Sequence, residues 1–214
     1  ISSWPEQESS EIRIQGFSGW KAGMTHIMMR DNNPNSTSAG QEIRKAVTVV
    51  EAPPMKVLAV RGYTNTPYGM QTAGEVWADL SESSLDGLMP RLANDTKAKN
   101  GEDEGIKPEK RGGRIPIRKK QNIDESFEAL KSYNLCEVRL IVATQPKLVR
   151  SIPTKIPEIM EVGLVGGDEA SRLEWAKNRL GDFISIDDVF KVGQEIDVVG
   201  VTKGKGWQGS RKRW

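Results

Sequence analysis

The residue types best suited to chemistry lie near the C-terminus. From Gly200 to Trp214 the chain carries five cations and no acidic residue, interleaved with glycines and two tryptophans. Lysine and arginine neutralise phosphates, glycine lets the backbone approach a sugar-phosphate chain closely, and tryptophan stacks on bases. The alternatives are a solvated basic tail or a protein contact, but exposed tryptophan is costly without a partner. The residues predicted here to bind nucleic acid are Lys203, Gly204, Lys205, Gly206, Trp207, Gln208, Arg211, Lys212, Arg213 and Trp214.

The same segment has a competing interpretation as a nucleotide site. Residues 204–209 formally match the pattern G-x-G-x-x-G of dinucleotide-binding proteins. That site requires a preceding strand, a helix that opens at the third glycine and an acidic residue about 20 positions further on. A strand is predicted at residues 195–202, but Ser-Arg-Lys-Arg-Trp follows the third glycine. A nucleotide-binding enzyme that uses the Gly204–Gly209 loop is therefore the alternative, because the flanking lysines suit a polyanion better.

A second glycine-rich segment runs from Gly16 to His26. It lacks the G-K-[ST] ending of a phosphate loop, so nucleotide hydrolysis has no support from it. Its three glycines predict a bulged strand or a sharp corner of a barrel. We expect Trp20 and Met24 in the core and Lys21 at the surface.

Catalytic and metal chemistry find few residues to work with. His26 is the only histidine and Cys136 the only cysteine, so a zinc site or a His-dependent triad has no basis. No pair of carboxylates marks a general acid and base. Cys136 lies in an apolar stretch and is expected to be a buried, inert thiol in a reducing compartment. We therefore predict no enzyme activity, no catalytic or metal-binding residue, no cofactor and no small-molecule substrate.

Charge is segregated along the chain of 214 residues. The net charge is only +2, and since residues 200–214 carry five positive charges, the remainder sums to −3. Residues 97–120 form a second basic stretch, with nine cations against four acids. No apolar run approaches the roughly 18 residues of a membrane-spanning helix, and the N-terminus does not resemble a signal peptide. We expect no membrane partner.

The hydrophobic pattern predicts short strands at both ends of the chain and helices between them. Strands are expected at residues 12–16, 24–29, 46–50, 57–60, 137–144 and 195–202. Helices are expected at 80–92, broken near Pro90, at 124–130 with Asp124 as N-cap, and from the N-cap Asp168 to a stop at Gly181. An extended connector holds Pro146, Pro153 and Pro157, and a short turn holds residues 186–190.

These elements predict a mainly β fold with an α/β insertion. Residues 1–11 form an N-terminal arm. A discontinuous β-barrel domain comprises residues 12–74 and 182–214, and an inserted α/β domain comprises residues 75–181 with an exposed basic loop at 97–120.

Four segments together resemble one known family. The stretch from Gly19 to Thr25 resembles the G-x-K-x-G-M-T signature of ribosomal protein three of the large subunit. The stretch from Val201 to Trp214 resembles its T-K-G-K-G-[FW]-x-G…K-R-[WH] signature. Residues 49–55 and 66–69 are similar to its archaeal and eukaryotic branch. The four matches occur in the family's order and cover essentially the whole chain.

The resemblance implies a split β-barrel of the translation-protein type, interrupted by an inserted α/β lobe. It implies a cytoplasmic, structural ribonucleoprotein component that binds 23S-type ribosomal RNA, adjoins neighbouring ribosomal proteins and helps assemble the region near the peptidyl-transferase centre. Because Lys21 falls in the first signature, the resemblance adds it to the predicted RNA-binding residues. The family's basic segments before Trp4 and after Trp214 are not in this sequence, so we expect a chain truncated at both ends. A third hypothesis is a translation-factor-like module with a stable protein partner and little salt dependence.

Overall fold

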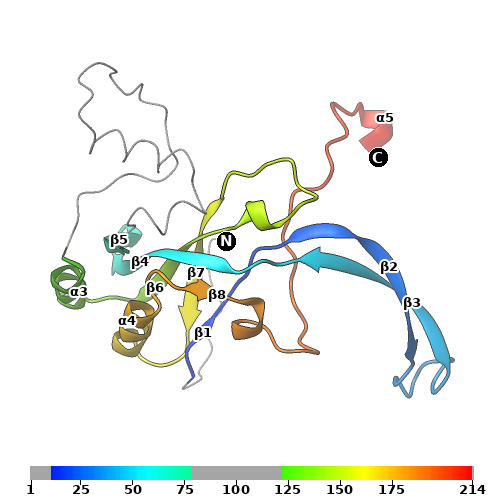
Figure 1. Ribbon diagram of the computed structural model, residues 1–214, viewed down its shortest axis with the longest axis horizontal. Coiled ribbons are helices and arrows are strands. Elements are labelled where there is room, and N and C mark those ends of the chain that lie inside the picture. The colour runs from blue at the N-terminus through cyan, green and yellow to red at the C-terminus, as the bar shows by residue number, and fades with distance from the viewer. Residues whose placement is uncertain (1–10, 79–121, 214) are drawn as a thin grey trace.

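A six-stranded antiparallel sheet forms the centre of the structure, a computed structural model that describes residues 11–78 and 122–213. The order across the sheet is β1, β7, β6, β4 and β5, and β8 pairs with the start of β4 (Figure 1). The strands are β1 (Arg13–Ile14), β4 (Met55–Thr66), β5 (Gly69–Trp77), β6 (Glu137–Ala143), β7 (Ile159–Val165) and β8 (Phe183–Ile184).

The central strand β4 carries the most deeply buried run of the chain. Its first six residues, 55–60, are all buried, although a sheet with one solvated face would show alternation. The strand pairs with β6 from Lys56 opposite Ala143 to Tyr63 opposite Glu137. On its other side it forms a hairpin with β5, which starts at Gly69 with φ of 104°. The apolar run therefore marks a strand covered on both faces.

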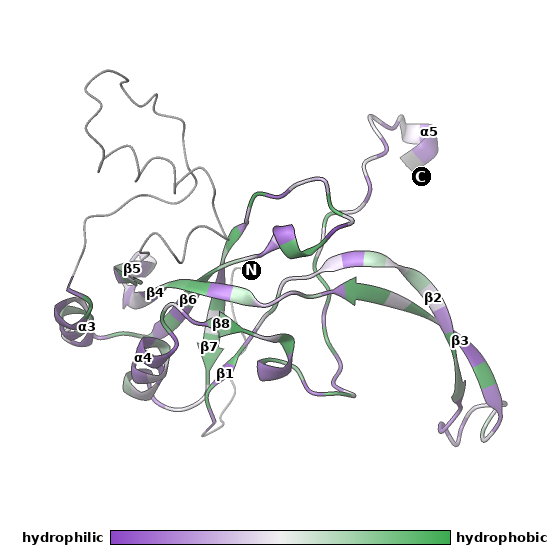
Figure 2. Ribbon diagram, in the orientation of Figure 1, coloured by the Kyte–Doolittle hydropathy of each residue, from purple (hydrophilic) through white to green (hydrophobic). Residues whose placement is uncertain are grey.

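Two helices cover the sheet and complete the core. Helix α3 (Ile123–Lys131) packs against β5, and α4 (Glu169–Asn178) packs against β6. The helix residues buried in the same cluster as the strands are Phe127, Leu130, Leu173 and Ala176. Asp168 is the N-cap of α4, as predicted, but the N-cap of α3 is Asn122, and Asp124 lies inside the first turn. Figure 2 shows the hydrophobic residues concentrated on the central strands beneath these helices.

A long hairpin leaves this body and curves away from it (Figure 1). It consists of β2 (Trp20–Arg30) and β3 (Glu42–Glu51), which pair with each other and with no other described strand. The whole hairpin is described, and none of its residues is buried. The prediction that Met24 lies in the core is therefore wrong, since its side chain is 65% exposed, whereas Trp20 is half-buried. No layer of the described chain packs on the hairpin as α3 and α4 pack on the sheet.

The last part of the chain has little regular structure. A 3-10 turn, η1 (Pro146–Leu148), follows β6, and a second, η2 (Ile186–Asp188), follows β8. Beyond η2 the structure describes one further element, α5 (Ser210–Arg213). Residues 191–207 are exposed throughout. The predicted strand at 195–202 is wrong for this structure, because a strand needs a neighbour for its backbone hydrogen bonds and no described strand runs beside it. Its apolar side chains, such as Val198 at 83%, remain exposed.

The predicted fold class is confirmed at the coarse level, since the described chain is mainly β. Its strands do not close into a barrel. The sheet also joins β4 and β5, predicted for the barrel domain, to β6 and β7, predicted for the insertion. The predicted boundary near residue 74 is thus not a boundary of the sheet, and the division into domains stays a prediction. Residues 1–10 of the arm, the helix at 80–92 and the loop at 97–120 lie outside the described residues.

Candidate nucleic-acid interface

The C-terminal segment presents its predicted site residues to solvent. Lys203, Lys205, Arg211 and Lys212 are exposed, and Trp207 is 98% exposed. Among the described residues, no carboxylate lies within ion-pair distance of these four cations. A segment of unpaired cations beside an exposed indole has both features of a single-stranded RNA contact, phosphate neutralisation and base stacking.

Local hydrogen bonds shape the glycine-rich part of this segment. Gly206 has φ of 69°, a conformation that favours glycine. The side-chain amide of Gln208 donates to the Lys205 carbonyl at 2.5 Å. A Cβ placed on Gly204 or Gly209 would meet nothing within 4 Å. Packing inside the chain therefore gives no reason for glycine at those two positions, which is expected if an external backbone approaches them closely.

The nucleotide-binding alternative lacks the structure that it needs. A helix does begin directly after Gly209, as that alternative predicted, but α5 has only four residues. The strand that should precede the motif is not formed, and the motif lies away from the edge of the sheet. In dinucleotide-binding folds the glycine loop is held between a sheet strand and a long helix. The structure therefore does not support this alternative.

Lys21 lies near the base of the hairpin, exposed and opposite Val50 in β3. The pairing register shifts between Lys21 and Gly23, which confirms the predicted bulge. Gly19 is required by packing, because a Cβ there would lie 2.7 Å from Val50 Cγ1. The described residues show no hydrogen bond or ion pair between Lys21 and the C-terminal segment, so the structure does not join these two parts of the predicted site.

Two predicted site residues remain predictions. Arg213 is the last residue of α5, and Trp214 lies outside the described residues.

An ion-pair network on the sheet was missed from the sequence. Arg61 Nε donates to Glu75 at 2.8 Å, and Arg61 also pairs with Glu161. Arg139 pairs with Glu161 and lies 4.3 Å from the centre of the Tyr63 ring, whose hydroxyl donates to Glu161 at 2.9 Å. The two-residue spacing of Arg61 and Tyr63 places them on one face, but only the register of four strands brings their partners together. These cations are paired within the chain and are not free for phosphates.

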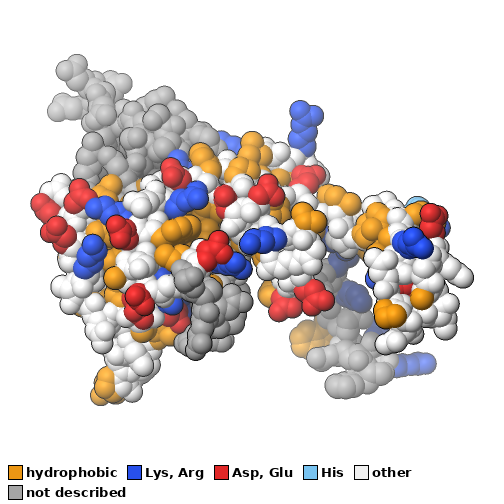
Figure 3. Space-filling model, turned by 90° about the horizontal axis from the view of Figure 1, so that it is seen from below, with side chains coloured by type: hydrophobic (Ala, Val, Ile, Leu, Met, Phe, Trp, Pro, Cys, Tyr) orange, Lys and Arg blue, Asp and Glu red, His pale blue; other side chains and the backbone are white. Residues whose placement is uncertain are grey.

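Acidic and basic side chains are mixed over the main body in the view of Figure 3. The ion-pair network of this body contrasts with the cations of the C-terminal segment, which have no carboxylate partner among the described residues. A polyanion is attracted to unpaired cations far more strongly than to an interspersed surface.

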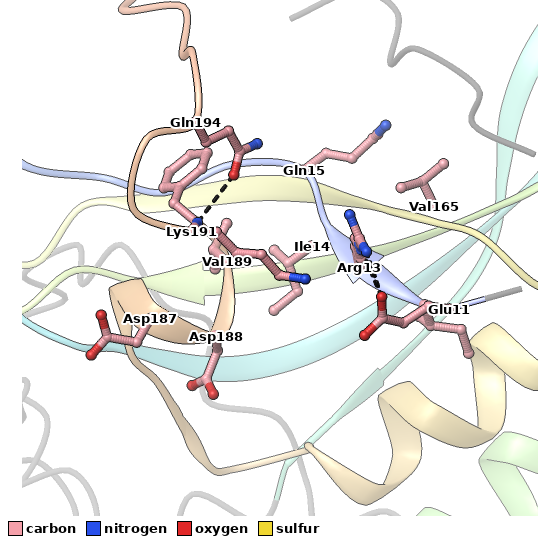
Figure 4. A pocket seen from close by; sticks show the side chains of 12 residues that line it. Glu11, Arg13, Ile14, Gln15, Val165, Asp187, Asp188, Val189, Lys191 and Gln194 are labelled. Carbon is pink, nitrogen blue, oxygen red and sulfur yellow. Dashed lines mark hydrogen bonds and ion pairs between the residues drawn. The ribbon is translucent and has the colours of Figure 1, made fainter. Parts of the chain in front are cut away.

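A hollow of about 260 Å³ between β1 and η2 does not form a catalytic site. Arg13 pairs with Glu11 at 2.5 Å, and the Lys191 backbone N–H donates to Gln194 Oε1 at 3.1 Å. Figure 4 shows the side chains of Asp187 and Asp188 on η2, directed away from Arg13. Within residues 11–78 and 122–213, no three His, Cys, Asp or Glu side chains gather as a metal site requires.

Two titratable side chains are shifted by their surroundings. Burial, followed by the charge of Glu137, raises the pKa of the half-buried Cys136 thiol, which donates to the Tyr63 carbonyl at 3.3 Å. A raised pKa disfavours the reactive thiolate, in agreement with the prediction of an inert thiol. Burial lowers the pKa of Lys56, whose ammonium lies 5.2 Å from the centre of the Phe183 ring. Neither group lies in the candidate interface.

Across residues 11–78 and 122–213, none of the helices combines the length and the apolar character that crossing a bilayer requires.

Comparison with known proteins identifies the family. The family model described as ribosomal protein L3 matches residues 1–214. The large ribosomal subunit protein uL3 of Archaeoglobus fulgidus is 41% identical over 214 residues, which cover 100% of this chain and 56% of that protein. The proteins of the same name from Sulfurisphaera tokodaii and Methanocaldococcus jannaschii are 42% and 39% identical, over 99% and 100% of this chain and 57% and 56% of their own lengths.

The chain thus spans little more than half the length of the curated relatives it matches. The match nevertheless covers all of the given sequence, including both glycine-rich segments. The resemblance read from four short segments is confirmed, and the chain belongs to the ribosomal protein L3 family.

Proposed function

We propose that this chain is a structural constituent of the large ribosomal subunit that binds 23S-type ribosomal RNA. The contact is made by the C-terminal segment, residues 203–214, together with Lys21. The protein acts in the cytoplasm within the subunit, beside neighbouring ribosomal proteins, and helps assemble the region near the peptidyl-transferase centre. It has no catalytic residues, and it requires neither a cofactor nor a small-molecule substrate.

The observation that carries the proposal is the exposure of unpaired cations around Trp207. This indole is 98% exposed, although burying an aromatic side chain is strongly favourable. The four described cations of the segment have no carboxylate partner among the described residues. In the ion-pair network of the sheet, by contrast, each arginine is matched by glutamates. The segment is therefore the part of the described chain that an RNA backbone and an unstacked base would satisfy best.

The mechanism of binding is electrostatic and steric. The cations displace counterions condensed on the RNA, which supplies affinity that falls with salt. The open space around Gly204 and Gly209 admits a sugar-phosphate backbone at close range. Trp207 stacks on a base that is not already stacked in a helix, which restricts the site to loops, bulges or strand ends.

The proposal extends to the fold. Residues 195–202 alternate between polar and apolar side chains over part of their length, and the β2–β3 hairpin has unpaired edges and exposed apolar residues. We propose that the two belong to one split β-barrel of the translation-protein type. Formation of this barrel would bury side chains such as Ile27, Val49 and Val198, which are 44%, 46% and 83% exposed.

Salt-dependent RNA binding tests the function. If the five cations of the segment contact five phosphates, log Kd should change against log salt with a slope of about 4 in magnitude. The double variant Lys203→Glu, Lys205→Glu should weaken binding to a large-subunit ribosomal RNA transcript at least about tenfold and reduce the slope by about 2. NAD and ATP should not compete.

The matched control is Lys131→Glu with Lys177→Glu, which reverses two exposed charges on α3 and α4. This control should bind as the unaltered chain does, apart from a small non-specific effect of net charge. Equal affinity of the two double variants would refute the assignment of the segment. Weak, salt-insensitive RNA binding with a captured nucleotide would instead support an enzyme, and a salt-insensitive protein partner would support the interaction module.

A further inference from the structure

A second basic surface lies in the loop between β6 and β7. Residues 144–157 contain three cations, Lys147, Arg150 and Lys155, and no acidic residue. All three side chains are exposed, and among the described residues none of them has a carboxylate partner. The sequence analysis interpreted this segment only as an extended connector, because its prolines dominate the pattern. We propose that it is a phosphate-binding contact with ribosomal RNA, an inference that rests on the proposed function.

The loop is anchored by hydrogen bonds at its base and by buried side chains, which separates it from an ordinary solvated basic loop. Its base is closed by the Thr144 N–H, which donates to the Glu158 carbonyl at 3.0 Å, and by the Glu158 N–H, which donates to Thr144 Oγ1 at 2.9 Å. Pro146, Val149 and Pro157 are buried. The cations therefore project from a backbone that is already ordered, so little backbone entropy is lost when RNA binds.

Internal hydrogen bonds set the direction of the loop. The N–H groups of Leu148 and Val149 donate to Gln145 and Pro146 at 3.2 and 3.1 Å, which forms the turn η1. Lys155 Nζ donates to the Val149 carbonyl at 2.5 Å and so draws the two arms of the loop together. The side chains of Lys147 and Arg150 make no hydrogen bond or ion pair with any described residue. Their ammonium and guanidinium groups are available to phosphate oxygens, and the plane of Arg150 can also stack on an unpaired base.

The loop lies at the same end of the sheet as the base of the hairpin. The Gln145 side-chain amide donates to the Pro54 carbonyl at 2.7 Å, just after β3 ends at Glu51. Trp20, next to Lys21, pairs with Glu51 at that base. Strand β8, from which the C-terminal segment continues, pairs with Lys56 opposite the end of β6. The hairpin base with Lys21 and the loop at 144–157 therefore start from one end of the sheet, where β8, the last strand before the C-terminal segment, also pairs (Figure 1).

RNA fits this surface better than a protein does. A protein interface of standard size has an apolar centre, whereas the exposed large apolar side chains here are Leu148 and Ile156, with Arg150 and Lys155 between them in the sequence. The three cations have no carboxylate partner among the described residues, so each would release counterions on contact with a phosphate.

The test compares salt slopes of the full 214-residue chain on a large-subunit ribosomal RNA transcript. The variant Lys147→Gln, Arg150→Gln keeps the Lys155 bond that shapes the loop. It should weaken binding about tenfold and reduce the salt slope by about 2. The charge-preserving variant Lys147→Arg, Arg150→Lys should bind within about twofold of the unaltered chain. The control Lys131→Gln, Lys177→Gln removes the same charge from the helices and should leave the slope unchanged.

The outcomes separate this inference from the proposed function. If the Lys203→Glu, Lys205→Glu variant loses binding but the loop variant behaves as its control, the loop inference fails alone. If the unaltered chain does not bind the transcript, both fail. Unchanged RNA affinity together with loss of a cross-link from the loop to a ribosomal protein in reconstituted subunits would assign the loop to a protein and overturn the RNA contact. Circular dichroism of each variant should match that of the unaltered chain.

Discussion

The six-stranded sheet and the β2–β3 hairpin use similar strand residues but bury them very differently. In β4, Val57 and Val60 are 0% exposed, whereas in β3, Val49 and Val50 are 46% and 52% exposed. Both runs are β-branched and both form regular antiparallel pairs. The difference is the layer above them, since α3 and α4 cover the sheet and no described element covers the hairpin. Strand formation thus followed from local sequence, and burial followed from the presence of a second layer.

The same two kinds of region differ in their charges. On the sheet, Arg61 pairs with Glu75 and Arg139 with Glu161, each across two neighbouring strands. In the C-terminal segment and in the loop at 144–157, the cations have no such partners among the described residues. A net charge of only +2 therefore conceals where a polyanion would bind, because the acidic residues lie outside the basic segments at 144–157 and 200–214. The β2–β3 hairpin differs from the sheet in stability as well, because an isolated two-stranded hairpin is only marginally stable in water. This favours packing of the hairpin against another part of the protein or against a binding partner.

The largest effect should come from removing a core side chain. Met55 in β4 is 1% exposed and Met28 in β2 is 62% exposed. Met55→Ala should lower the free energy of unfolding by about 2–5 kcal/mol, because it leaves a cavity in the core. Met28→Ala should change it by less than about 0.5 kcal/mol. Urea unfolding followed by circular dichroism measures both. Similar losses would mean that the hairpin is buried by another part of the protein in solution.

A smaller effect is expected in the ion-pair network. Glu161→Gln removes the carboxylate that pairs with Arg61 and Arg139 and accepts from Tyr63 at 2.9 Å. The free energy of unfolding should fall by about 1–3 kcal/mol, because two partly buried arginines each lose one of their two carboxylate partners. Asp124→Asn, which breaks the exposed pair with Lys177, should cost less than about 0.5 kcal/mol. Thermal unfolding at low and high salt measures both, and an equal loss would place the network on a solvated surface.

The smallest effect compares two glycines. A Cβ on Gly62 in β4 would lie 2.8 Å from Leu135 Cδ2 and 3.0 Å from Leu130 Cδ2, whereas one on Gly23 in β2 would meet nothing within 4 Å. Gly62→Ala should destabilise the protein by about 1 kcal/mol, since overpacking outweighs the gain from a stiffer unfolded chain. Gly23→Ala should be neutral or slightly stabilising. A destabilised Gly23→Ala would reveal a close neighbour of the hairpin, as the proposed barrel requires.

Much of the fold was predictable because local patterns controlled it. The β-branched runs became β3 and β4, Asp168 became the N-cap of α4, and the glycines at 16–23 produced a bulge. Two predictions were wrong, the burial of Met24 and the strand at residues 195–202. In both, an apolar pattern was interpreted as evidence for a packing or strand-pairing neighbour. Alternating apolar and polar side chains show that one face of a strand is suited to a core. Whether that face is buried depends on which other elements pack against it.

The candidate site divides along the same line. The C-terminal cations could be predicted as a nucleic-acid contact from the sequence alone, because five of them lie within residues 200–214 and no acidic residue lies among them. The loop at 144–157 was overlooked because its cations are spaced among prolines. The inference that it binds phosphates depends on two tertiary contacts. The Glu158 N–H donates to Thr144 Oγ1 at the base of the loop, and the Gln145 amide donates to the Pro54 carbonyl, 91 positions away in the chain.

The sequence by itself determined the family, the mainly β class and the position of the basic C-terminal segment. These properties depend on residue types and on short-range spacing, which the chain carries wherever it folds. Only the tertiary structure decided which cations are paired, as Arg61 and Arg139 are, and which apolar strands are covered. Pairing and burial are properties of residues far apart in the chain, and strand register and helix packing alone bring those residues together.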